Sequence, residues 1–155
     1  MANSNPTKPK SFTCRTTAEW LGRRGVRFAA DADQKPPILI ANPPELDGAP
    51  REWTPEDLLI GSIETCLLLT FTAMIERHHL PVEAYYSETE GLLELEDGTY
   101  HFSEITIRPT IIISDAAGAD RVLKFLDAAH RECLVANSVT TAVAVKPHVV
   151  MSAAE

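Results

Sequence analysis

The stretch TPEDLLIGSIETCLLLTFTAMIERHHL, residues 54–80, predicts a long central helix. Thr54 suits the N-cap position, Pro55 the first helical position, and Asp57 can complete a capping box. Apolar residues recur at helical spacing through Leu59, Ile63, Leu67, Phe71 and Met74. Further leucines and isoleucines widen this apolar face almost to a full turn. Such a helix needs cover on most of its sides, so we expect it to be mostly buried.

Cys66 stands at the centre of this helix and shares one side of it with Ser62 and Thr70. Most free cysteines in a helix are small packing residues, and spacing alone favours that interpretation for Cys66. A column of small, weakly polar groups is an unusual setting for a packing residue, however. Both a structural and a chemical role for Cys66 therefore stay open at this point.

Length and charge restrict the class of protein. With 155 residues and 45% hydrophobic content, we expect a single domain over residues 11–155, after a disordered lead over residues 1–10. The net charge of −8 and the lack of a basic cluster argue against nucleic acid and anionic membranes as partners. The lead has no apolar signal segment, so we expect a cytoplasmic protein. Glu64 and several hydroxyls interrupt the apolar run 58–75, so we expect no membrane span.

The cysteines do not form a metal or disulfide pattern. Cys14, Cys66 and Cys133 lie far apart, and no CxxC pair occurs. A structural zinc site and a secreted disulfide framework are therefore both disfavoured. The five histidines are scattered, so we expect no metal site. We assign Cys14 a packing role in a predicted strand, while two distant cysteines can still act as a catalytic pair.

The remaining elements predict an α+β fold. We expect a hairpin over residues 12–28 with an arginine-bearing turn, a short strand at 38–41, and a loop over 42–53. A long hairpin follows over 82–113, turning at Asp97-Gly98 and carrying glutamates on a solvated face.

A second helix is expected after Ser114 and Asp115, which can cap it. Its apolar column is Val122, Leu126, Ala129 and Cys133. One closing strand is expected over residues 138–150. The predicted order is β-β-β-α-β-β-α-β, with an antiparallel sheet.

Two segments, TPEDLLIGSIETC and ECLVANS, resemble the signature regions of the OsmC/Ohr family of thiol peroxidases. The matching residues are Pro55, Glu56, Leu58 and Cys66 in the first segment, and Cys133, Asn137 and Ser138 in the second. The family often has proline after its second cysteine, whereas Leu134 stands there in this chain, as in OsmC-like branches. The resemblance covers nearly all of the chain after the first ten residues.

The resemblance implies a reaction and its partners. Cys66 would be oxidised by a hydroperoxide to a sulfenic acid, and Cys133 would condense with it to a disulfide. No prosthetic group would be bound, and an external dithiol, such as a lipoyl-bearing protein, would recycle the disulfide. The surrounding leucines and phenylalanine favour an organic hydroperoxide with an apolar group.

A reactive Cys66 thiolate needs a compensating cation, because burial among leucines disfavours the charged form. Arginine suits this role, since it stays charged and a carboxylate can hold it in place. Arg23 in the predicted Gly-Arg-Arg-Gly turn is the best match to the family arginine, with Arg24, Arg27 and Arg51 as alternatives. Glu56 is the predicted carboxylate.

Helix geometry separates Glu56 from Cys66 by about 15 Å along the axis and about 80° around it. One arginine side chain is too short to contact both groups. Either the helix is interrupted near Gly61, or a second chain supplies its own glutamate and arginine; the resemblance implies an intertwined homodimer. A non-catalytic dimeric module that binds an apolar ligand and a thiol redox sensor are the alternative functions.

Overall fold

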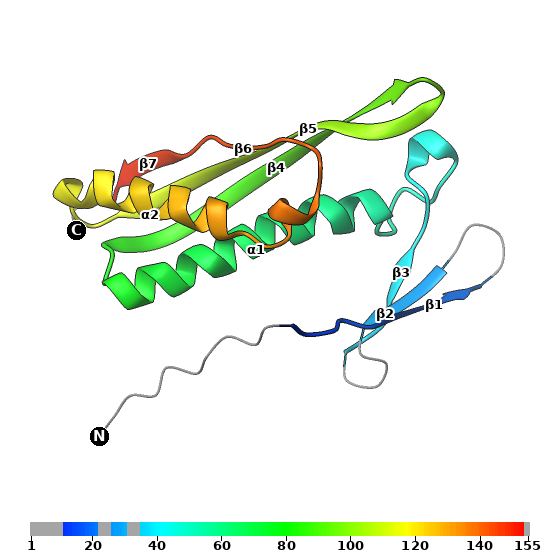
Figure 1. Cartoon of the computed structure of the whole chain (residues 1–155), viewed down its shortest axis with the longest axis horizontal. Coiled ribbons are helices and arrows are strands. Elements are labelled where there is room, and N and C mark those ends of the chain that lie inside the picture. The colour runs from blue at the N-terminus through cyan, green and yellow to red at the C-terminus, as the bar shows by residue number, and fades with distance from the viewer. Residues whose placement is uncertain (1–10, 22–25, 31–34, 154–155) are drawn as a thin grey trace. The chain divides into compact units, whose positions relative to one another are not determined.

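The computed structural model describes residues 11–21, 26–30 and 35–153 (Figure 1). The chain divides into two compact units, residues 1–56 and residues 57–155, and each unit has its own sheet. The expected disordered lead lies outside the described residues.

The first unit contains a three-stranded antiparallel sheet. Its strands are β1 (Thr16–Trp20), β2 (Val26–Ala30) and β3 (Ile38–Ile40), in that order. The predicted hairpin and short third strand are therefore confirmed, and a short 3₁₀ helix, η1 (Pro44–Leu46), lies in the expected loop. The prediction for Cys14 is wrong: the residue precedes β1 and is exposed, so it is not a packing residue in a strand.

Helix α1 (Pro55–His78) begins directly after Thr54, as predicted, and continues through Gly61 without interruption. Within α1, the fully buried side chains are Ile63, Leu67 and Phe71. Leu69 is 70% exposed. The expectation of a mostly buried helix is therefore wrong for the described residues: one stripe of α1 packs into the core of residues 57–155, and much of its other apolar surface is partly buried or exposed.

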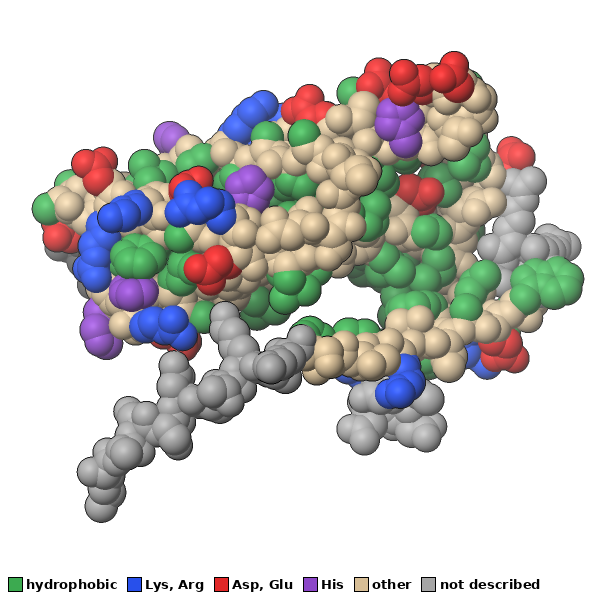
Figure 2. All heavy atoms as spheres, viewed as in Figure 1, with side chains coloured by type: hydrophobic (Ala, Val, Ile, Leu, Met, Phe, Trp, Pro, Cys, Tyr) green, Lys and Arg blue, Asp and Glu red, His purple; other side chains and the backbone are tan. Residues whose placement is uncertain are grey.

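A long antiparallel hairpin follows α1, formed by β4 (Val82–Glu96) and β5 (Thr99–Ile113). Asp97 and Gly98 both have positive φ, at 50° and 78°, as a two-residue type I′ turn requires. Acidic side chains gather at the tip of this hairpin, at the upper right of Figure 2. The predicted solvated glutamates are all exposed: Glu83, Glu88, Glu90, Glu94 and Glu96.

Helix α2 (Ala119–Glu132) is preceded by a 3₁₀ turn, η2 (Ala116–Gly118). Asp115 caps that turn, since its carboxylate accepts the Ala117 N–H at 2.9 Å. The predicted helix is thus confirmed, although the predicted cap residue Asp115 caps η2 and not α2 itself. The predicted apolar column is fully or almost fully buried: Val122, Leu126, Ala129 and Cys133.

The end of the chain differs from the prediction of one closing strand. After η3 (Ala136–Ser138), two short strands, β6 (Val143–Val145) and β7 (His148–Met151), pair with the same strand β5. Pro147 has no N–H to contribute to a ladder and stands at the break. Both strands run parallel to β5, because the α2 crossover returns the chain in the same direction. The second sheet is therefore mixed, which corrects the predicted antiparallel sheet.

The core of the second unit lies between this sheet and the two helices. The inward-facing residues of β5 are all buried: Ile105, Ile107, Pro109, Ile111 and Ile113. Residues of α1 and α2 belong to the same buried cluster. The α+β fold class is confirmed. By length and composition α1 could also cross a membrane, but core helices pass the same test, and Ile63, Leu67 and Phe71 lie in this core.

Candidate functional site: two neighbouring thiols

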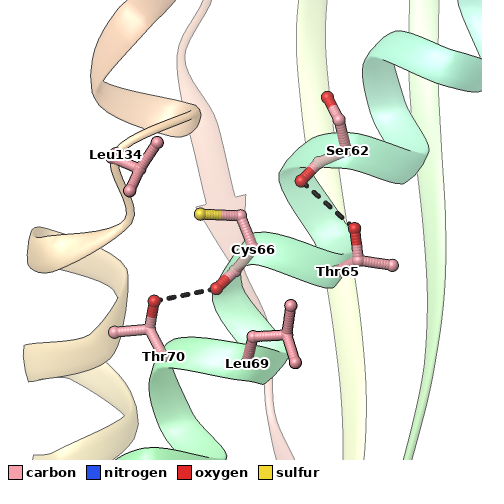
Figure 3. A pocket seen from close by; sticks show the side chains of 6 residues that line it. All are labelled: Ser62, Thr65, Cys66, Leu69, Thr70 and Leu134. Atoms are coloured by element: carbon pink, nitrogen blue, oxygen red, sulfur yellow. Dashed lines mark hydrogen bonds between the residues drawn. The ribbon is translucent and has the colours of Figure 1, made fainter. Parts of the chain in front are cut away.

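Cys66 lies on α1 at the wall of an open pocket of about 380 Å³. The pocket is lined by Ser62, Thr65, Cys66, Leu69, Thr70 and Leu134. Figure 3 shows the Cys66 sulfur directed from α1 toward the segment that carries Leu134. The predicted column of Ser62, Cys66 and Thr70 therefore faces one cavity, and the Cys66 thiol is partly exposed there.

The hydroxyl groups around Cys66 form hydrogen bonds to the backbone of α1. Ser62 Oγ donates to the carbonyl oxygen of Leu59 at 2.7 Å, and Thr70 Oγ1 donates to that of Cys66 at 2.8 Å. Thr65 Oγ1 likewise donates to the carbonyl oxygen four residues earlier, at 2.7 Å. Because these protons are used within the helix, the hydroxyls face a ligand mainly as acceptors. No charged side chain lines the pocket among the described residues.

Cys133 forms the C-cap of α2 and is fully buried. Its thiol donates to the carbonyl oxygen of Ile63 on α1, with an S···O distance of 3.8 Å. Burial is the main cause that raises the pKa of the Cys133 thiol; backbone N–H groups of Ala136 and Val135 oppose the rise, and the neighbouring Cys66 thiol adds to it. The two thiols are therefore neighbours in space, and both are free.

Glu56 is the second residue of α1 and is partly buried. Its Oε2 atom is buried and has no hydrogen-bond partner among the residues that the structure describes. A carboxylate oxygen in that state is costly unless a donor satisfies it. Glu56 therefore has an open acceptor of the kind that an arginine would fill.

The predicted arginines divide into two groups. Arg23, the preferred residue, and Arg24 fall in the segment 22–25, which the structure does not describe. Arg27 lies on β2 and pairs with Glu19 at 2.7 Å, with both side chains exposed. Arg51 is exposed. The choice of Arg23 stays a prediction.

Sequence reasoning missed three residues of the pocket wall: Thr65, Leu69 and Leu134. Thr65 follows Ser62 by three positions and Leu69 follows Cys66 by three, so helical spacing contained a signal for them. Leu134 follows Cys133, and its place beside Cys66 depends on the packing of α2 against α1. Among the described residues, no group of three His, Cys, Asp or Glu side chains could hold a metal ion.

The mixed sheet, the two helices packed on it and the adjacent thiols define a small α+β protein with a two-cysteine site. A sequence model of OsmC-like proteins matches residues 47–148, and the chain belongs to this family. The predicted family membership is thus confirmed.

Known relatives agree with this assignment. The chain is 29% identical over 103 residues to YmaD of Bacillus subtilis, an uncharacterized protein; the match spans 64% of this chain and 69% of YmaD. An OsmC-like protein of unknown function from Vibrio cholerae has a similar structure, with a TM-score of 0.77 and 19% identity over 90% of this chain and 100% of that protein. An organic hydroperoxide resistance protein from Elizabethkingia anophelis has a TM-score of 0.73 and 18% identity over 94% of this chain and 100% of that protein. These two structures confirm the predicted fold.

Proposed function

We propose that the protein is a thiol peroxidase that reduces apolar organic hydroperoxides through Cys66 and Cys133. The observation that carries this proposal is the pair of neighbouring thiols, one facing an open pocket and the other buried behind it. In this proposal Cys66 reacts with a substrate in the pocket. Cys133 then reacts with the product formed on Cys66.

The proposed peroxidase reaction has three steps. The Cys66 thiolate attacks one peroxide oxygen, the O–O bond breaks, and the departing alkoxide takes up a proton to give the alcohol. The sulfenic acid on Cys66 then condenses with the Cys133 thiol, forming the S–S bond and releasing water. An external dithiol finally reduces the disulfide and is itself oxidised to a disulfide.

A cation must stabilise the Cys66 thiolate and the departing alkoxide. Arg23 is our candidate, held by Glu56, whose buried Oε2 has no hydrogen-bond partner among the described residues. Since α1 is continuous through Gly61, an interrupted helix does not explain how one arginine reaches both Glu56 and Cys66. We therefore propose that a second copy of the chain completes each site in an obligate homodimer. The apolar surface of α1 that residues 57–155 leave exposed, with Leu69 70% exposed, supports this arrangement.

The substrate class follows from the pocket wall. Leu69 and Leu134 flank Cys66 and offer contact to an alkyl group, whereas hydrogen peroxide has no such group. Three of the pocket's side chains carry hydroxyl oxygens that can accept a hydrogen bond from the O–H group of a hydroperoxide. The names of structural neighbours such as the Elizabethkingia protein support an organic hydroperoxide as substrate.

The proposal is tested by steady-state turnover of tert-butyl hydroperoxide and of hydrogen peroxide, with dithiothreitol or dihydrolipoamide as the reductant. We expect faster turnover of the organic peroxide and a Cys66–Cys133 linkage in peptide maps of the oxidised protein. Cys14→Ser is the matched control and should retain activity, because Cys14 is exposed and lies outside the site. Lack of turnover together with no linkage would reject the peroxidase, and a fully active monomer in light scattering would reject the obligate dimer.

A further inference from the structure

The two sulfurs of the site differ in access. Cys133 has no exposed surface, since its thiol lies against the Ile63 carbonyl inside the core. Cys66 is partly exposed and opens onto the pocket. A second copy of the chain could add cover to both residues but could not uncover Cys133. A reductant therefore has a direct approach to only one of the two sulfurs in this fold.

The two sulfurs also differ in their ability to carry negative charge after the disulfide breaks. Backbone N–H groups of Ala136 and Val135, at the start of η3, favour the Cys133 thiolate and partly offset the rise in the pKa of this thiol that burial causes. The hydroxyls of Ser62, Thr65 and Thr70 near Cys66 donate to carbonyl oxygens of α1 instead. These amide groups lower the cost of a departing thiolate at Cys133, although burial still leaves the pKa of its thiol raised.

We infer that the recycling dithiol attacks the Cys66 sulfur, entering through the pocket, and that Cys133 is the leaving group. This inference rests on the disulfide of the proposed function and specifies the direction of its reduction. The dithiol's first sulfur forms a bond to Cys66 Sγ as the Cys66–Cys133 bond breaks, and the electron pair departs on Cys133. The dithiol's second sulfur then attacks the first, releasing Cys66 as a thiolate and the reductant as a disulfide.

The state of Cys133 after release agrees with this direction. Burial raises the pKa of its thiol, so the departed thiolate takes up a proton at neutral pH. The resulting S–H donates to the Ile63 carbonyl, which is the arrangement of the reduced structure. Rates of thiol–disulfide exchange depend on which sulfur is accessible and on how well the leaving thiolate is stabilised. Access favours Cys66 as the sulfur that is attacked, because Cys133 is enclosed. The raised pKa of Cys133 by itself makes it the poorer leaving group, but access decides the direction of attack.

The test uses the full chain with the disulfide formed by diamide, so that it does not depend on peroxidase activity. The oxidised protein is treated with glutathione, quenched with acid within the first turnover, and digested for peptide mapping. We expect the glutathione adduct on Cys66 at least about tenfold over Cys133, which corresponds to about 1.4 kcal/mol in relative barrier height. Adduct mainly on Cys133, or in equal amounts on both, would overturn the inference.

Two single-cysteine variants provide the matched comparison. In a Cys14→Ser background, Cys133→Ser and Cys66→Ser each leave one cysteine. Each variant is converted to its mixed disulfide with 5-thio-2-nitrobenzoate, and release of the label by dithiothreitol is followed by absorbance. Release from Cys66 should be at least about tenfold faster, since Cys133 is enclosed. Failure of Cys133 to accept the label, with ready labelling at Cys66, supports the same conclusion; faster release from Cys133 contradicts it.

The outcomes also separate this inference from the proposed function. If diamide forms the linkage and hydroperoxides do not, the peroxidase is rejected while the direction of attack is still measured. If neither oxidant joins Cys66 to Cys133, both proposals fail together.

Discussion

Helices α1 and α2 pack on the same sheet yet differ in how much of their apolar surface the chain covers. The apolar column of α2 is buried from Val122 to Cys133. Helix α1 is apolar nearly all round, but its fully buried stripe runs only through Ile63, Leu67 and Phe71. The apolar column of α2 is thus buried within residues 57–155, whereas these residues leave much of the apolar surface of α1 partly buried or exposed. Each helix contributes one thiol. Cys133 at the end of α2 is buried, and Cys66 on α1 is partly exposed.

The largest expected effect is on turnover at the exposed thiol. Cys66→Ser should lower kcat/KM for tert-butyl hydroperoxide by at least about 1,000-fold, because a hydroxyl cannot replace the thiolate nucleophile. Stopped-flow or coupled assays measure this loss, and circular dichroism checks that the variant is folded. Retention of more than about a tenth of the activity would show that Cys66 is not the nucleophile.

The contrast in burial predicts different effects on stability. Leu126→Ala in the buried column of α2 should lower the free energy of unfolding by about 2–5 kcal/mol. Leu69→Ala on α1 should change it by less than about 0.5 kcal/mol if the side chain stays as exposed as in the single chain.

Urea unfolding measures both values at several protein concentrations. A large loss for Leu69→Ala that depends on protein concentration would show that a second copy covers this part of α1. A large loss without concentration dependence would contradict the exposure of Leu69.

The pocket wall predicts an effect on substrate binding. Leu134→Asp should raise KM for an apolar hydroperoxide about tenfold, because the contact with the alkyl group is lost and a charge enters the pocket. Leu134→Met is the matched control, since it keeps an apolar side chain of similar volume. Equal effects on tert-butyl hydroperoxide and hydrogen peroxide would indicate that Leu134 does not contact the alkyl group.

The smallest expected effect is a pH dependence of stability that comes from Cys133. Burial raises the pKa of this thiol in the folded protein, so the folded state holds the proton more tightly than the unfolded state. The stabilisation is complete below the unfolded pKa of about 8.5 and is lost as the pH rises through the folded pKa, at about 1.4 kcal/mol per unit of pKa difference.

Urea unfolding of the reduced protein at about pH 7.5 and about pH 9.5 measures this loss. Cys133→Ala removes the titrating group and should show a smaller decrease over the same interval. An identical decrease in both proteins would show that Cys133 does not contribute to the pH dependence.

Local sequence signals predicted much of this fold. Pro55 after Thr54 marked the start of α1, and Asp97-Gly98 located the turn of the long hairpin. The spacing of Val122 and Leu126 located α2, because its apolar residues form a single stripe. In each case the residues that decide the structure are neighbours along the chain.

The errors concern features that depend on distant contacts. The division of the last segment into β6 and β7 depends on how both strands pair with β5, although Pro147 was a local sign of the break. The incomplete cover of α1 depends on what packs against it rather than on its own periodicity. At the site, the family resemblance suggested that Cys66 and Cys133 meet, whereas the place of Leu134 in the pocket wall required the tertiary structure.

The backbone-bonded hydroxyls around Cys66 have a consequence for hydration. Water in the pocket can donate to the hydroxyl oxygens of Ser62, Thr65 and Thr70 but finds few side-chain donors there, so it makes fewer hydrogen bonds than beside free hydroxyls. Each of these side chains is polar, but its hydroxyl proton is donated to a backbone carbonyl oxygen of α1. A helix surface with such residues can therefore be desolvated by an apolar ligand at lower cost than its serine and threonine content suggests.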